Sequence, residues 1–135
     1  MLIKDNHLAA VGGPDRVGRA VALARQGAPH TLRIEIEVTT LDELAQALEA
    51  GADIVLLDNM EIADLRKAVA MTAGRALLEA SGGVTLESVA EIAATGVDLI
   101  SVGALTHSAP ALDISLDLEL SETRHNESPH ELNSQ

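Results

Sequence analysis

The sequence predicts an α/β fold in which parallel strands alternate with helices. Short apolar runs alternate with amphipathic segments along the chain, and one helix–glycine–strand pattern occurs twice. The residues are 47% hydrophobic and 0% aromatic, so the core must consist of Val, Ile, Leu and Ala, the usual filling of parallel sheets and barrel interiors. A length of 135 residues fits a single domain with a real core.

The apolar runs predict the strands, and helical periodicity predicts the segments between them. Strands are expected to end at Ile3 and to cover 34–38, 54–58, 76–81, 99–102 and 112–118. Helices are expected near 14–26, 41–50, 61–73 and 86–95. Residues 121–135 are polar and show no periodic pattern of apolar residues, which predicts a disordered tail. We therefore expect a domain over 1–118 and a tail over 119–135.

The repeated pattern relates residues 41–58 to residues 86–103. In both copies the apolar residues recur at helical spacing, and Gly51 or Gly96 then ends the helix before an X-Asp pair and an apolar run. Thr40 and Glu43 predict a capping box at the first helix, and Thr85 caps the second. A repeated unit of this kind favours a partial βα barrel; a doubly wound sheet is the alternative.

Charge and composition exclude several classes of partner. The net charge of −12 disfavours nucleic acid and anionic membranes. The chain has no apolar run of membrane-spanning length, and its N-terminus does not resemble a secretory signal. Cysteine is absent, so there is no disulfide framework. We expect a cytoplasmic protein.

Polar and glycine residues follow several of the predicted strands. In barrels and open α/β sheets the working site lies at the carboxyl ends of the strands, so these residues are the candidates. They are Lys4, Asn6, His7, Glu37, Asp58, Asn59, Ser81, Gly82, Gly83, Gly103 and His107.

The glycines of two successive loops point to an anion. Gly82 and Gly83, before the helix capped near Thr85, offer backbone N–H groups and a positive helix end to a phosphate. Gly103 offers a second set in the next loop, and His107 is a further donor. The alternatives are tight turns that require a positive φ, and a surface histidine.

Two acids near strand ends point to a ribose or a metal. Alternation along the strand places Glu35 and Glu37 on one face, and Glu37 lies nearer the end of the strand. Glu37 and Asp58 suit ribose hydroxyls or Mg²⁺, whereas the alternative for the glutamates is a solvated face. Asn59 has the alternative role of capping the next helix.

Lys4 and His7 belong to a polar cluster that follows Ile3. Lysine is a natural ligand for phosphate or carboxylate, and histidine carries protons. The alternative, which these few residues favour when taken alone, is a polar loop after a strand.

Five segments resemble quinolinate phosphoribosyltransferase, also called carboxylating nicotinate-nucleotide pyrophosphorylase. They occur in the family's order and at similar spacing over residues 1–118, and they are "IKDNH", "IEIEV" with "LDE", "GADIVLLDNM", "LEASGGVT" and "ISVGALTHSAPALDISLD". The resemblance implies the C-terminal part of a type II phosphoribosyltransferase-like barrel. It also implies a reaction of quinolinate with phosphoribosyl pyrophosphate and Mg²⁺. The products are nicotinate mononucleotide, pyrophosphate and carbon dioxide, in NAD biosynthesis.

The resemblance also assigns roles to the candidate residues. Ser81, Gly82, Gly83, Gly103 and His107 correspond to the cradle of the 5-phosphate. Glu37 and Asp58 correspond to the acids near the ribose and its metal, and Lys4 to the lysine at the quinolinate and pyrophosphate end.

The chain also departs from the family. Family members are longer, and an N-terminal domain and the first barrel strands precede "IKDNH". The family is typically a dimer in which that domain completes the partner's site. We therefore expect a truncated chain with weak catalysis on its own. The alternative is a non-catalytic phosphate-binding or subunit-interaction remnant, and a different phosphate-binding barrel enzyme would require the motif string to be coincidence.

Overall fold

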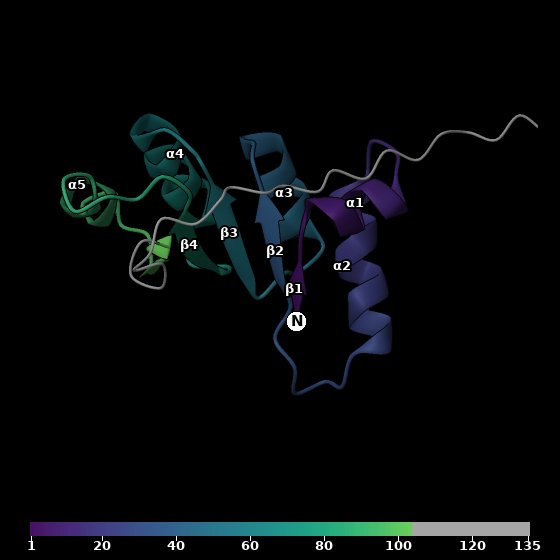
Figure 1. The fold of residues 1–135 in the computed structure, drawn as a ribbon. Helices are drawn as coiled ribbons and strands as arrows, with labels where there is room; N and C mark the ends of the chain where they lie inside the picture. The colour runs from purple at the N-terminus through teal and green to yellow at the C-terminus, as the bar shows by residue number, and fades with distance from the viewer. Residues whose placement is uncertain (104–135) are drawn as a thin grey trace, which may run out of the picture.

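The computed structural model describes residues 1–103, which form one parallel sheet with helices between its strands (Figure 1). His107, the expected strand over 112–118 and the expected tail over 119–135 lie outside the described residues. The strands are β1 (Leu2–Ile3), β2 (Glu35–Val38), β3 (Ile54–Asp58), β4 (Leu77–Ser81) and β5 (Leu99–Ile100).

Three helices lie close to their predicted positions, one is shorter than predicted, and one is an addition. They are α1 (Asp5–Val11), α2 (Arg16–Gly27), α3 (Leu41–Glu49), α4 (Ile62–Thr72) and α5 (Val89–Ala93). Helix α1 replaces the polar loop that these few residues alone favoured. Lys4 is its N-cap, and His7 Nδ1 accepts a hydrogen bond from the Lys4 N–H at 3.0 Å, so the polar cluster is a helix start.

The start of α5 also differs from the prediction. The expected helix over 86–95 is replaced by a turn over 86–88 followed by the short α5. Thr85 and Ser88 exchange hydrogen bonds, since the N–H of each donates to the other's hydroxyl at 3.0 and 3.3 Å. Thr85 therefore caps this turn, and the helix begins later than its apolar pattern indicates.

The sheet order supports the barrel over the doubly wound alternative. The five strands are all parallel and follow chain order, β1-β2-β3-β4-β5. Because crossovers between parallel strands are right-handed, a sequential order places every helix on the same side. A doubly wound sheet reverses its order at a switch point. This part of the chain is thus a section of a βα barrel.

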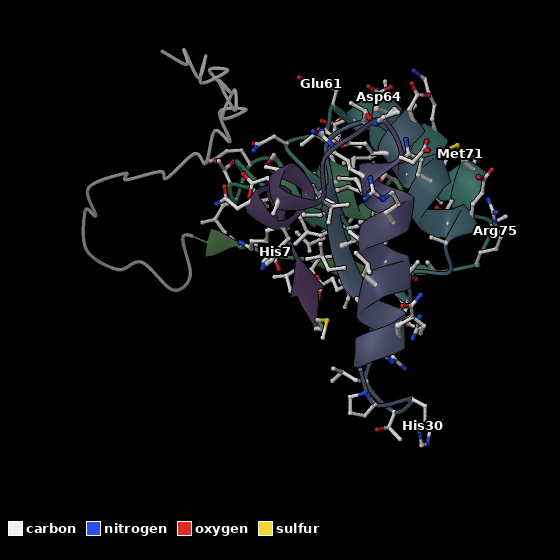
Figure 2. The ribbon with its side chains drawn as sticks, turned by 90° about the vertical axis from the view of Figure 1, so that its right-hand side faces the viewer. His7, His30, Glu61, Asp64, Met71 and Arg75 are labelled. Atoms are coloured by element: carbon white, nitrogen blue, oxygen red, sulfur yellow. The ribbon has the colours of Figure 1, made fainter. Side chains whose placement is uncertain are left out.

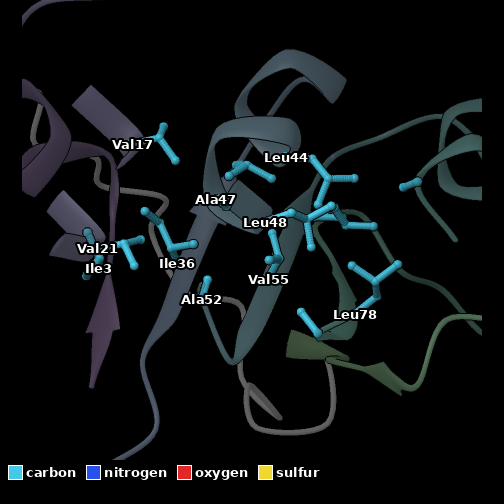
Figure 3. Packing of buried hydrophobic residues seen from close by; sticks show 14 of the residues in the cluster. Ile3, Val17, Val21, Ile36, Leu44, Ala47, Leu48, Ala52, Val55 and Leu78 are labelled. Carbon is cyan, nitrogen blue, oxygen red and sulfur yellow. The ribbon is translucent and has the colours of Figure 1, made fainter. Parts of the chain in front are cut away.

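The hydrophobic core lies between the helices and the side of the sheet that they cover (Figure 3). The alternate strand residues Ile36, Val55 and Leu78 are at most 2% exposed, and Val17 of α2 and Leu44 of α3 pack against this layer. The described core contains only aliphatic side chains, as the composition requires.

The opposite side of the sheet has no helix over it within residues 1–103, and we call it the open face. Its residues alternate with those of the core and are Leu2, Glu35, Glu37, Ile54, Leu56, Asp58, Leu77, Glu79, Ser81, Leu99 and Ser101. Leu2 and Leu99, on the edge strands, are 40% and 43% exposed. In a closed barrel this face would point inward.

The repeated X-Asp pair has a structural role at the amino ends of the strands. Asp53 Oδ2 accepts the Ile34 N–H at 2.7 Å, and the Asp53 N–H donates to the Ile34 carbonyl at 2.9 Å. Asp98 makes the same two contacts with Leu78, at 2.8 and 2.9 Å. Each aspartate thus joins its own strand to the neighbouring one.

In residues 1–103, no helix combines the length and the apolar character needed to cross a lipid bilayer.

Candidate active site at the carboxyl ends of the strands

Lys4 and Glu37 meet at the carboxyl ends of β1 and β2. Leu2 and Ile3 pair with Glu35 and Ile36, which brings the residue after β1 beside Glu37. Lys4 Nζ lies 3.9 Å from Glu37 Oε2, and the two side chains are 55% and 17% exposed. The sequence named both residues, and the parallel register brings them together.

Glu37 lies in a field that favours its protonated form. Burial raises the pKa of the Glu37 carboxyl, and the nearby Asp58 carboxylate raises it further. Lys4 opposes this rise in pKa and Asp5 adds to it. Glu37 and Asp58 are therefore close enough to repel each other, and a positive group between them would be favourable.

Asn59 connects the end of β3 to the end of β4. Asp58 and Ser81 are paired as the last residues of their strands. The Asn59 N–H donates to the Ser81 carbonyl at 3.0 Å, and Asn59 Nδ2 donates to Asp58 Oδ2 at 3.2 Å. Asn59 does not cap α4, whose N-cap is Glu61.

Gly82 and Gly83 form a turn that only glycine fits well. Their φ angles are +82° and +58°. A Cβ on Gly82 would lie 2.5 Å from Asn59 Cγ. The tight-turn explanation is therefore sufficient for these glycines. Within residues 1–103, their N–H groups meet no acceptor, so they are available to a ligand.

The helix end expected beside these glycines is not there. Helix α5 starts at Val89, with Thr85 and the turn over 86–88 in between. The hollow next to the glycine turn, about 280 Å³ in volume, is also lined by Glu61 and Glu91. Carboxylates disfavour an anion, so the turn's N–H groups and not this hollow are the candidate anion ligands.

The remaining candidates are more dispersed. Gly103 follows β5, and no atom lies within 4 Å of a Cβ built on it. Figure 2 shows that His7 lies on α1.

Sequence reasoning missed Arg16 and Thr39, which line a small cavity of about 80 Å³ together with Glu37. Glu43 joins them: its carboxylate accepts Arg16 Nη2 at 2.8 Å and the Thr39 N–H at 2.9 Å. Burial acts to raise the pKa of the Glu43 carboxyl, but these hydrogen bonds outweigh it and lower that pKa. The only indication of this site in the sequence was that Thr39 directly follows a predicted strand.

The predicted capping box is half confirmed. The Glu43 N–H donates to Thr40 Oγ1 at 3.2 Å, as expected. The Glu43 carboxylate, however, accepts from Thr39, the residue before the N-cap. Glu43 therefore fixes the residue that follows β2.

The fold and this rim define a βα-barrel protein whose candidate site residues lie at the carboxyl ends of parallel strands. Residues 1–117 match the model of the quinolinate phosphoribosyl transferase C-terminal domain. The chain belongs to this family.

Curated relatives and solved structures agree with that membership. The probable carboxylating nicotinate-nucleotide pyrophosphorylase of Bacillus subtilis is 45% identical over 90% of this chain and 41% of its own length. The Homo sapiens carboxylating nicotinate-nucleotide pyrophosphorylase is 45% identical over 87% of this chain and 40% of its own length. The nicotinate-nucleotide pyrophosphorylase structure from Francisella tularensis superposes with a TM-score of 0.71 at 47% identity, covering 78% of this chain and 36% of that one. This chain thus spans about two fifths of the length of the curated relatives it matches.

Proposed function

We propose that this chain provides the phosphoribosyl-binding half of a carboxylating nicotinate-nucleotide pyrophosphorylase. In this proposal Ser81, Gly82 and Gly83, with Gly103 and His107, bind the 5-phosphate of phosphoribosyl pyrophosphate. Glu37 and Asp58 bind near the ribose, and Lys4 faces quinolinate and the departing pyrophosphate.

A chain of contacts along the rim supports this proposal. Lys4 lies 3.9 Å from Glu37, the Glu37 carboxyl senses the Asp58 carboxylate, and Asn59 joins Asp58 to the Gly82 turn. Four neighbouring strands therefore offer a cation, two acids and free N–H groups in succession. A phosphorylated sugar that loses a pyrophosphate group needs this set of groups.

The chemistry assigned to each group follows from its charge. Loss of pyrophosphate leaves positive charge on the ribose, which the carboxylates of Glu37 and Asp58 stabilise. Lys4 balances the negative charge that grows on the leaving pyrophosphate. The quinolinate ring nitrogen then forms the bond to the ribose carbon that pyrophosphate has left. Loss of a carboxyl group as carbon dioxide leaves an electron pair on the ring carbon, and a proton from solvent takes its place to complete the reaction.

The residues present fit a Mg²⁺ ion that is shared with substrate. Mg²⁺ is bound through one or two carboxylates plus substrate phosphates, and Glu37 and Asp58 are such a pair. Within residues 1–103, no group of three or more His, Cys, Asp or Glu side chains is arranged to hold a metal alone. When bound, the ion would neutralise charge on the pyrophosphate.

We further propose that the activity belongs to a cytoplasmic homodimer, as the family resemblance implies. The net charge of −12 supports small-molecule substrates over nucleic acid or an anionic membrane surface.

Calorimetric titration with ribose 5-phosphate tests the binding proposal, with ribose as the ligand that lacks the phosphate. We expect ribose 5-phosphate to bind and ribose to bind far more weakly. Asp58→Asn should weaken binding by about tenfold, because a charge-assisted hydrogen bond is lost. Asp64→Asn is the matched control, since Asp64 lies in α4 and pairs with Lys67. Equal affinities for the two sugars, or for the two variants, would contradict the proposal.

An assay for nicotinate mononucleotide separates the enzyme from the non-catalytic alternative. The chain is assayed alone and with the remaining part of the Bacillus subtilis relative added as a separate polypeptide. Turnover in the mixture supports the enzyme. Binding of ribose 5-phosphate without turnover in either sample supports a phosphate-binding remnant.

A further inference from the structure

Asn59 has a left-handed backbone conformation although it does not end a helix. Asn59 and Ala73 are the two non-glycine residues with positive φ among residues 1–103, at +49° and +48°. Ala73 is the left-handed C-cap of α4, a common way to end a helix. Asn59 ends no helix and follows a strand, and asparagine is one of the few residues with a side chain that adopts this left-handed conformation readily.

Three contacts hold Asn59 in place, and they involve two strand ends. Its N–H reaches the Ser81 carbonyl at 3.0 Å, and its Nδ2 reaches Asp58 Oδ2 at 3.2 Å. Its amide group occupies the space of a missing Gly82 side chain, with Cγ, Nδ2 and Oδ1 all within 2.6 Å of the Cβ position. Asn59 thus orients the Asp58 carboxylate while it packs on the glycine turn.

We propose that Asn59 is a positioning residue that fixes the Asp58 carboxylate relative to the N–H groups of Gly82 and Gly83. The Asp58 carboxylate, which binds a sugar hydroxyl, is then held at a fixed distance from the N–H groups of Gly82 and Gly83, which bind the phosphate. This inference rests on the proposed function. Gly82 is therefore needed for two reasons: its backbone has a positive φ, and the Asn59 amide fills the space that a Cβ would take.

The first experiment compares Asn59→Gly with Ala73→Gly. Both variants give the left-handed position to glycine, which adopts it without strain, so both should unfold in urea near the wild-type midpoint. Asn59→Gly also removes the side chain that contacts Asp58 and Gly82. We expect its Kd for ribose 5-phosphate to rise about tenfold, while that of Ala73→Gly stays at the wild-type value. A merely structural role would leave both Kd values unchanged.

A double-mutant cycle with Gly82→Ala tests whether the two residues act as one unit. Gly82→Ala should weaken ribose 5-phosphate binding for two reasons: its φ of +82° disfavours alanine, and the new Cβ displaces the Asn59 amide. Asn59→Gly removes the second cause, so the loss in the double variant should be smaller than the sum of the two single losses. Fully additive losses would overturn the inference.

An NMR measurement keeps the inference testable if the wild-type chain does not bind ribose 5-phosphate, which would refute the proposed function alone. In Asn59→Gly, the ¹⁵N relaxation of Gly82 and Gly83 should show greater mobility than in the wild type and in Ala73→Gly. Unchanged relaxation at both glycines would overturn the inference whatever the ligand does.

Discussion

Gly82 is constrained by its own backbone and by a neighbour. Its φ of +82° disfavours any residue with a Cβ, and Asn59 fills the space where that Cβ would lie. Gly74 has a similar φ of +76°, but no atom lies within 4 Å of a Cβ placed on it. An alanine at Gly74 therefore measures the destabilisation caused by a positive φ alone, and an alanine at Gly82 measures that effect together with steric crowding by Asn59.

Alanine substitutions at these two positions should differ in stability. Gly74→Ala should lower the free energy of unfolding by about 1 kcal/mol, the cost of a left-handed alanine. Gly82→Ala should lower it by about 3 kcal/mol, because overpacking against Asn59 is added. Urea unfolding curves measure both values. Equal losses would show that Asn59 moves aside freely.

At the scale of the elements, the repeat accounts for how neighbouring strands are joined. Residues 53 and 98 occupy equivalent places in the two copies, and each aspartate makes the same pair of contacts with a neighbouring strand. The repeated Gly-X-Asp is thus a device for strand pairing at the amino ends of the strands, where barrels concentrate stability.

Removal of either aspartate side chain should destabilise the fold. Asp53→Ala and Asp98→Ala should each lower the free energy of unfolding by about 2 kcal/mol, since a strand N–H loses its charged acceptor. Asp64→Ala is the control, because it removes an exposed pair with Lys67 and an acidic side chain in the first turn of α4, and it should cost less than about 1 kcal/mol. Thermal or urea unfolding decides, and a loss at Asp98 no larger than at Asp64 would rule out the pairing role.

Periodicity predicted most elements and failed where local contacts prevail. The bounds of β3 match the predicted 54–58 because that run is apolar throughout and ends at Asp58. Helix α1 was missed because its start is made by the His7 side chain and not by a usual capping residue. Helix α5 is shorter than its pattern, since the Thr85–Ser88 pair stabilises a turn first.

At the scale of the whole molecule, the strand order places the candidate site residues at one rim of the sheet. Which of them contact one another depends on the strand register and on local conformation. Parallel strands in chain order necessarily bring Lys4, Glu37, Asp58 and Gly82 to one rim, so their proximity was predictable. The packing of Asn59 against Gly82 was not predictable, because the left-handed conformation of a single asparagine does not change the hydrophobic periodicity of the sequence.

The open face also makes the stability of the molecule depend on pH. Burial raises the pKa of the Glu35 carboxyl, and the charge and hydrogen bond of Glu79 raise it further. The Met1 amino group and Lys4 lower it in part. Above the ordinary value of 4.5, the folded chain therefore holds a proton at Glu35 more readily than the unfolded chain does.

Stability should accordingly fall as pH rises from 4.5 through the folded pKa of Glu35. Glu35→Gln removes this contribution and should reduce the dependence of the urea midpoint on pH above about pH 4.5, while the raised pKa of Glu37 keeps part of the slope. Glu49→Gln, on the exposed end of α3, should keep the wild-type slope. The lowered pKa values of Glu43 and Asp53 act only at more acidic pH, where stability falls as pH decreases. Identical slopes in all three proteins would contradict this role of Glu35.

The aspartates that clasp neighbouring strands stand at the opposite ends of those strands from Lys4, Asp58 and the glycine turn. The strand-pairing aspartates and the candidate site thus lie at opposite ends of the same sheet. A library that randomises Lys4 and Asp58 leaves the clasps intact, so new ligand preferences are accessible on this scaffold without loosening it.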